Sequence, residues 1–463
     1  MSGEKKQMKQ AFNMNHLVFL LLGVMPLLTE PVTAQTPLKD TALTLPDAIQ
    51  LAMTQNPEIL SAHSQVESGD HKVVAARSGL WPEVNVAETF QNTNNPMWAF
   101  GTKLNQGEIT QMDFDPDRLN DPDAINNYNT SLSLGWSIYD GGRTLAGLSQ
   151  AKLNTKFTRL GLKKTKQDII SKTAQAYVGL LLADQNQKVI DKALTTAKVH
   201  QTMIKSRFSG GFVVKSDLLR AQVRIFELTQ EQLQAESQVE IAKARLNAAM
   251  GNPMDTPLVL VTPFQICAET EENQAVWIER ALKHRPDLKQ LVLQKEMALE
   301  QIKMNRAGHL PQVMLNGAYE VDTEDFDNTA DSYTVGATVQ LNLFAGKGVS
   351  AKVKAAKADL NKVSAMYTAL ARGVEVQTRE AYLLTQSAWQ RITVAKQSVT
   401  QSEEALRIVM NRYKGGLLTI VDLLDAQVAD QQARTLHFKA LHDYKVARIK
   451  LAAAAGVIGP DFQ

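Results

Sequence analysis

Side chains that could carry out chemistry are few in this chain, and their spacing forms no catalytic motif. Among 463 residues Cys267 is the only cysteine, which leaves no disulfide framework, no CxxC redox pair and no cysteine-rich zinc site. The eight His are scattered, and none belongs to an HExxH pair. Gly346-Lys347 lacks the upstream glycine of a phosphate-binding loop. We therefore expect no enzyme activity, no cofactor and no metal site.

The charge balance also argues against a nucleic-acid partner. Fifty Lys and Arg stand against 48 Asp and Glu, a net charge of +2, and neither sign dominates a long stretch. A protein that tracks phosphates needs a basic surface. Length and a hydrophobic content of 44% would ordinarily suggest about three compact domains.

The N-terminus has the pattern of a secretory signal peptide. Lys5, Lys6 and Lys9 precede an apolar run at 17–28, and Ala34 suits the cleavage site. The run is too short to span a bilayer, and no later stretch reaches the length of a membrane helix. We therefore expect residues 1–34 to be removed on export. A membrane β-barrel remains open, because its alternating strands barely raise the mean hydropathy.

The elements that follow are duplicated. The segments 207–223 and 412–428 align without gaps at an offset of 205 residues and share nine of 17 positions, including a Gly-Gly pair and Asp-Leu-Leu. Upstream the offset becomes 229, which places a 24-residue insertion in the first copy. The insertion lies in a stretch rich in Asn, Asp, Gly and Pro, which predicts a loop over 92–125.

Each copy contains two segments in which apolar and polar residues alternate. In the second copy Tyr333, Val335, Ala337 and Val339 alternate with polar or small residues. Alternation over about ten residues is typical of a transmembrane β-strand, with one face to lipid and one to a wet lumen. Four strands cannot close a barrel, but three chains would supply 12. A four-stranded sheet on a soluble domain shows the same alternation and is the alternative.

Long helices follow the strands. No Pro interrupts residues 143–207, a length of about 98 Å as a helix, which no compact domain accommodates. Return helices begin after the Gly-Gly pairs, and Ala recurs every seven residues in them, as in Ala433, Ala440 and Ala447, which predicts close supercoiled packing. In the first copy, residues 35–251, we expect strands at about 83–91 and 129–139 and helices at about 47–77, 143–207 and 215–250. In the second copy, residues 276–456, we expect strands at about 312–321 and 332–344 and helices at about 276–306, 348–412 and 420–455.

These features together resemble the TolC-like outer-membrane efflux and secretion channels. The resemblance covers nearly the whole mature chain and rests on the duplicated Pro-led strands, the Tyr-Asp-Gly-Gly and Phe-Ala-Gly-Lys strand exits and the Arg-aromatic-x-Gly-Gly turns. It implies a fold that is mainly α with a β-barrel portion. In that fold a homotrimer forms a 12-stranded outer-membrane β-barrel, continued by a long periplasmic α-helical coiled-coil tunnel. Residues 252–275 would be an equatorial linker, and residues 457–463 a C-terminal tail beside it.

The resemblance also assigns functional residues near the Gly-Gly turns. Asp422 and Asp425 match an acidic ring at the periplasmic aperture, although an acid in a first helical turn, such as Asp422, also suits the helix dipole. Asp217 and Tyr413 match contacts between neighbouring tip helices. A basic residue of that lock is replaced here by Leu418. The turns that periplasmic adaptors recognise correspond to Gly210, Gly211 and Phe212 and to Gly415, Gly416 and Leu417, although the chemistry of a tight turn alone also explains the glycines.

We therefore interpret the protein as the outer-membrane exit duct of a tripartite efflux or type I secretion system in a Gram-negative bacterium. Its expected partners are two further copies, outer-membrane lipid, a periplasmic adaptor protein and an inner-membrane pump of the RND, ABC or MFS type. A soluble periplasmic coiled-coil scaffold and a secreted enzyme are the alternatives. The exported substrate, the pump class and the role of the loop 92–125 are left open by the sequence.

Overall fold

The computed structural model describes residues 42–261, 264 and 272–461. The expected signal peptide at 1–34 lies outside the described residues, as does part of the expected linker 252–275. The described elements are β1 (Ala42–Leu43), α1 (Leu45–Gln55), α2 (Pro57–Ser78), β2 (Glu83–Thr93), α3 (Pro96–Gln106), η2 (Gln111–Phe114), α4 (Pro116–Asn120), β3 (Ile125–Tyr139), α5 (Arg143–Ser209), α6 (Lys215–Met250), β4 (Val259–Leu260), α7 (Gln274–His284), α8 (Pro286–Arg306), η3 (Ala307–His309), β5 (Gln312–Thr323), β6 (Ala330–Gln340), α9 (Gly348–Lys414) and α10 (Ile420–Ala454).

A four-stranded antiparallel sheet joins the two copies in the order β2-β3-β5-β6. Each copy supplies one hairpin, and β3 of the first pairs with β5 of the second. The strand expected at 332–344 ends earlier, at Gln340, which pairs with Gln312. Pro311 precedes Gln312 and has no N–H to offer, so the ladder stops there. Strands β2 and β6 are the edges of the sheet.

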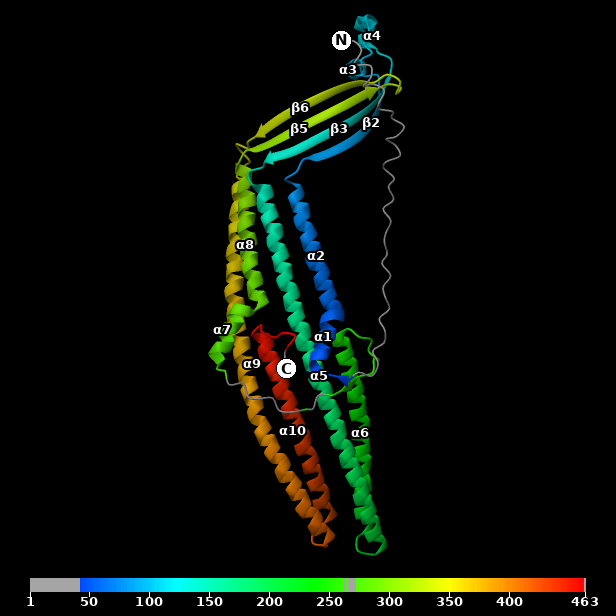
Figure 1. Cartoon of the computed structure of the whole chain (residues 1–463), viewed down its shortest axis with the longest axis vertical. Helices are drawn as coiled ribbons and strands as arrows, with labels where there is room; N and C mark the ends of the chain where they lie inside the picture. The colour runs from blue at the N-terminus through cyan, green and yellow to red at the C-terminus, as the bar shows by residue number, and fades with distance from the viewer. Residues whose placement is uncertain (1–41, 262–263, 265–271, 462–463) are drawn as a thin grey trace. The chain divides into compact units, whose positions relative to one another are not determined.

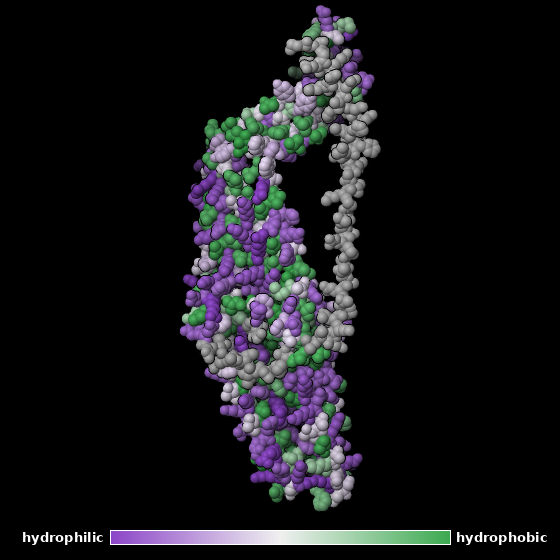
Figure 2. Space-filling model, in the orientation of Figure 1, coloured by the Kyte–Doolittle hydropathy of each residue, from purple (hydrophilic) through white to green (hydrophobic). Residues whose placement is uncertain are grey.

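The two faces of the sheet differ in polarity, as the alternation predicts. Val86 pairs with Leu132, and Leu132 pairs with Tyr319, so these three side chains share one face. The opposite face carries Asn129, paired with Asp322. The apolar face is solvent-accessible in the protomer, with Val86 67% exposed. Figure 2 shows apolar side chains gathered over the sheet, while polar ones dominate the helices below it.

Helices α5 and α9 are 67 residues each, about 100 Å at 1.5 Å per residue. Each begins just after a strand and ends at a Gly-Gly turn, from which α6 or α10 returns. The sheet therefore lies at one end of the long helices and the two turns at the other (Figure 1). We call the residues around 205–217 and 410–425 the first and second tips.

The shorter helices stack end to end beside the long ones. The helical ranges 47–77 and 276–306 are each divided into two helices at the X-Pro steps, because Pro57 and Pro286 begin a new helix after an extended residue. An extended conformation is what the residue before a proline adopts. Helices α2 and α6 lie against α5, and α8 and α10 lie against α9.

The core runs along the seams between the helices. The heptad prediction for the return helices is confirmed, since Ala433, Ala440 and Ala447 are at most 8% exposed and Leu228 and Leu246 are buried. Small residues at a seam let helix axes approach closely. Each protomer thus has long, thin clusters of buried side chains instead of one globular core.

The predicted loop 92–125 is partly helical. The segment does connect two strands, but it also contains α3, η2 and α4, which the prediction of a loop did not include. Asn95 and Asp115 cap α3 and α4 with their side-chain oxygens, and a proline follows each of them at the first helical position. These are ordinary helix-start signals, and the high content of turn-forming residues obscured them.

Candidate functional site

The two tips end in the same tight turn. The N–H of Phe212 donates to the carbonyl of Arg207 at 2.9 Å, and the N–H of Leu417 donates to that of Arg412 at 3.0 Å. Gly211 and Gly416 have φ of 78° and 76°, which a residue with a side chain adopts only with strain. Phe212 and Leu417 are 82% and 76% exposed. Each turn thus presents an apolar side chain on a rigid backbone.

Asp422 is exposed and acts as a helix cap. Its carboxylate accepts hydrogen bonds from the N–H of Thr419 at 2.8 Å and from the Thr419 hydroxyl at 2.7 Å, and Thr419 caps α10 in return. These hydrogen bonds hold the pKa of Asp422 below its ordinary value. The carboxylate is therefore charged at neutral pH. Asp425 is also exposed, three residues further along α10, and its side chain accepts no hydrogen bond from the described residues.

Tyr413 is buried in the cluster that joins the two tips. It is 3% exposed and packs with Ile204, Ile420 and Leu423. Burial raises the pKa of Tyr413, the guanidinium of Arg207 opposes this, and Asp217 reinforces it. Within the described structure the Tyr413 hydroxyl has no hydrogen-bond partner. Asp217 is thus an electrostatic neighbour of Tyr413 without being bonded to it in one protomer.

Arg207 links the two tips, a role that the sequence analysis did not assign. Its guanidinium donates to the carbonyl of Tyr413 at 2.9 Å and to that of Lys414, and lies 5.3 Å from the centre of the Tyr413 ring. It therefore satisfies C-terminal carbonyls of α9 and stacks on an aromatic face. The Arg-aromatic pair in the repeat was the available signal. The contact itself joins residues 206 positions apart and has no local pattern.

Above the tips, polar contacts connect the helical hairpin α5–α6 with the helical hairpin α9–α10. Arg224 of α6 contacts Gln431 of α10, whose amide donates to Glu231 of α6 at 2.6 Å. The Arg224 side chain is only 11% exposed. Such partly buried networks are costly to break, because each released charge or amide is left unpaired.

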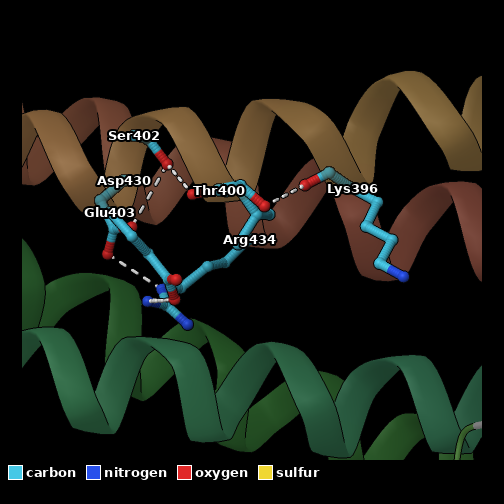
Figure 3. A network of polar contacts seen from close by, with 7 residues as sticks. Lys396, Thr400, Ser402, Glu403, Asp430 and Arg434 are labelled. Atoms are coloured by element: carbon cyan, nitrogen blue, oxygen red, sulfur yellow. Dashed lines mark hydrogen bonds and ion pairs between the residues drawn. The ribbon is translucent and has the colours of Figure 1, made fainter.

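A second network fixes α9 to α10 (Figure 3). Arg434 donates to Asp430 at 2.9 Å and pairs with Glu403 across the helix interface, while the Ser402 hydroxyl donates to Asp430 at 3.3 Å. Figure 3 shows Arg434 of α10 between the two carboxylates, which come from different helices. The second hairpin is thereby held as one unit.

A cavity of about 370 Å³ lies between the hairpins at this level. His200, Arg224 and Asp430 are among its lining residues, and His200 also contacts Gln427. Burial lowers the pKa of His200, and Lys414 lowers it further. His200 is therefore neutral at pH 7, and its protonation opposes the packing of the hairpins.

Within the part of the chain that the structure describes, three or more His, Cys, Asp or Glu nowhere gather as a metal site. No described helix is both long and apolar enough to cross a membrane.

The structure thus combines a sheet that has one apolar and one polar face with two helical hairpins about 100 Å long, an arrangement consistent with an outer-membrane channel. The chain belongs to the outer membrane efflux protein family, whose sequence profile matches residues 48–252 and 277–457. Its fold class is thereby confirmed as mainly helical with a barrel portion.

Two curated relatives and one solved structure illustrate the similarity. The chain is 22% identical to the proteases secretion protein PrtF of Dickeya chrysanthemi over 434 residues, covering 90% of this chain and 89% of PrtF. It is 25% identical to the alkaline protease secretion protein AprF of Pseudomonas aeruginosa over 428 residues, covering 90% and 85%. The Campylobacter jejuni CmeC outer membrane channel superposes with a TM-score of 0.78 at 16% identity, covering 95% of this chain and 96% of CmeC.

The protein is therefore an outer-membrane channel of a Gram-negative bacterium that extends into the periplasm and serves as an exit for efflux or secretion. The soluble scaffold is not supported, because it leaves the sheet and the family match unexplained.

Proposed function

We propose that three copies of this chain assemble into one duct, and that the periplasmic tips form its aperture and its docking site. The observation that carries the trimer is the sheet with two unpaired edges, β2 and β6, and an exposed apolar face. Edge strands with free N–H and C=O groups cannot lie in lipid. Three sheets of four strands make 12, and because the strands of each sheet alternate in direction, β6 of one copy would run antiparallel to β2 of the next.

The helices at the two sides of the protomer also expose apolar side chains, which supports this assembly. Helix α6 packs on α5 and carries a further apolar row, Leu219, Val223, Phe226 and Leu233, of which Phe226 is 72% exposed. Residues spaced by three and four lie along one helix face. Helix α9 lies at the other margin and exposes Leu384 and Val394. We propose that these rows meet between neighbouring copies.

In the trimer, Asp422 and Asp425 form the acidic ring of the closed aperture. Both are exposed at the start of α10, and the Asp422 carboxylate is held ionised by Thr419. Three copies around one axis sum their fields, which attracts cations and repels anions. The capping role of Asp422 and the ring role are compatible, because a capping carboxylate keeps its charge.

Asp217 and Tyr413 complete the closed tip by a hydrogen bond. The Tyr413 hydroxyl is buried and without a partner within the described protomer, and a buried donor in that state costs free energy. The negative charge of the Asp217 carboxylate helps to raise the pKa of Tyr413. A small shift of α6, or the neighbouring copy, brings the acceptor to it.

The two Gly-Gly turns dock the periplasmic adaptor. Gly210, Gly211 and Phe212, with Gly415, Gly416 and Leu417, form rigid turns with exposed apolar tips. The adaptor in turn connects the duct to an inner-membrane pump of the RND, ABC or MFS type. Export of a polypeptide by type I secretion is supported by the likeness to PrtF and AprF, which are protease secretion proteins.

Membrane fractionation and unheated gels test this proposal. We expect the protein in the outer-membrane fraction, migrating as a heat-sensitive trimer, and export that stops when the gene is deleted. A protein that is monomeric in the outer membrane would contradict the duct. Paired deletion of candidate pump genes then identifies whether a small molecule or a polypeptide is retained.

A further inference from the structure

The segment between β2 and β3 folds into a small unit, which we call the cap (residues 94–124). Its helices are held by the Lys103–Asp113 ion pair at 2.9 Å and by Phe100 and Phe114, whose rings pack edge to face at 5.7 Å. Ala99 is 1% exposed beneath them. The cap is therefore ordered by contacts of its own.

The cap is fixed to the polar face of the sheet. Gln106 of α3 donates to the side chain of Asn127 and to the carbonyl of Asn126, both at 2.8 Å, and Asn127 donates to Asp322 at 2.7 Å. Asp322 is 2% exposed and Asn127 is 8% exposed. Asp322 pairs with Asn129, and residues 127 and 129 share one face of β3. This is the face opposite Leu132 and Leu134.

The position of the cap decides what it can touch. In Figure 1, α3 and α4 lie at the end of the sheet far from the long helices. In a closed barrel the apolar face contacts lipid and the polar face lines the lumen. The cap is thus at the external mouth of the lumen, and its contacts with the sheet keep it away from the lipid.

The side of α3 that faces away from the sheet is apolar. Ala99, Thr102 and Gln106 lie on its buried side, whereas Met97 and Leu104 lie on the opposite side and are 84% and 52% exposed. Gly101 lies between them, and a Cβ atom added to it would meet no other atom within 4 Å. Met97 and Leu104 carry no polar group that would account for the exposure of this side of α3 to a water-filled lumen.

The radius of the barrel indicates which partner covers the apolar side of α3. Twelve strands about 4.8 Å apart, tilted by about 40°, give a backbone wall with a radius of about 12 Å. A helix with its side chains is about 10 Å across. A helix lying against that wall reaches nearly to the axis, so three such helices must meet each other.

We propose that the apolar side of α3, centred on Met97 and Leu104, is an interface for the same surface of the two neighbouring copies, and that the three caps close the external mouth. The proposal rests on the trimer of the proposed function. The duct then has a constriction at each end, one acidic at the periplasmic tips and one apolar at the exterior. Cargo must part the caps to leave.

Crosslinking tests the contact directly. In a Cys267→Ser background, Leu104→Cys should give covalently linked chains with a short bis-maleimide on intact cells. The matched control is Asn92→Cys, which lies at the same end of the barrel but on the apolar face, opposite Asn126. It should give none. Crosslinks from both positions, or from neither in an intact trimer, would overturn the proposal.

Accessibility tests the closure. A Ser131→Cys reporter on the polar face should react slowly with a membrane-impermeant maleimide added outside, and several-fold faster when Leu104→Lys places three like charges between the caps. Asn120→Lys adds the same charge at the end of α4 and should leave the rate unchanged. Equal rates in all three proteins would refute the closed mouth even if trimers persist. Loss of trimers in the parent protein would refute the proposed function itself.

Discussion

The two tips have the same backbone conformation at their turns but differ in the contacts of their side chains. Both turns have a left-handed glycine and the same hydrogen bonds. Helix α10, however, is preceded by Thr419, which forms a capping box, whereas α6 is preceded by Val214, which provides no side-chain cap. Arg207 of the first tip donates to carbonyls of the second, whereas the side chain of its repeat counterpart Arg412 makes no hydrogen bond to any described residue. Duplication thus preserved the turn and left the first tip to restrain the second.

The largest effect is expected from the glycine of the second turn. Gly416→Val places a β-branched residue at φ of 76°, which strains the turn and distorts the docking surface. We expect export to be lost while trimers remain on unheated gels. Gly211→Val at the first turn is the matched comparison, and export by both variants would argue against docking at the tips.

Removing the acids of the second tip should have the next largest effect. With Asp422→Ala and Asp425→Ala together, the proposed ring loses its charge, and block of single-channel conductance by multivalent cations in planar bilayers should be greatly weakened. Glu236→Ala removes an exposed carboxylate of α6 outside the tips and should retain most of the block. Unchanged block in the double variant would remove the ring assignment.

Arg207, which links the two tips, gives a direct test of their asymmetry. Arg207→Ala removes two charge-assisted hydrogen bonds to carbonyls, which in general contribute about 1.5 to 3 kcal/mol each, and should raise the resting conductance of the closed duct. Arg412→Ala should not. Similar conductance changes in both variants would mean that the tips are equivalent in the assembly.

The smallest effect is expected from pH. Burial lowers the pKa of His200 in the folded state, so between that value and the unfolded value of about 6.5 the unfolded chain binds more protons. Contact between the hairpins therefore weakens as pH falls below about 6.5 and is complete above it. Lys192, Arg224 and Glu403 line the same cavity and Lys414 is nearby. Conductance should rise modestly from pH 7.5 to 5.5, and less so in His200→Gln.

Much of the fold could be predicted because its signals are local. Alternation sets the faces of the strands, proline sets the starts of α2 and α8, and paired glycines end the long helices. The link from Arg207 to Tyr413 could not be predicted, because it depends on how the two hairpins approach each other. The cap was missed because Asn, Asp and Pro serve helix starts as well as turns.

The candidate site was predicted unevenly for the same reason. Asp422 and the glycines have positional roles that a turn sequence reveals. The surroundings of Tyr413 depend on tertiary packing, since it is buried in one cluster with Ile204 of α5 and Leu423 of α10. The departure at Leu418 in the second tip is accompanied by a cation from the first tip, Arg207, which donates to the carbonyl of Tyr413.

The two unpaired edges of the sheet have a consequence for how the protein is made. A folded but solitary protomer offers strand templates and an apolar surface to any chain it meets, which is the usual route to aggregation. Only association with two further copies removes both hazards at once. The lifetime of the newly exported chain is therefore governed by mass action, and low expression should favour its proteolysis over its accumulation.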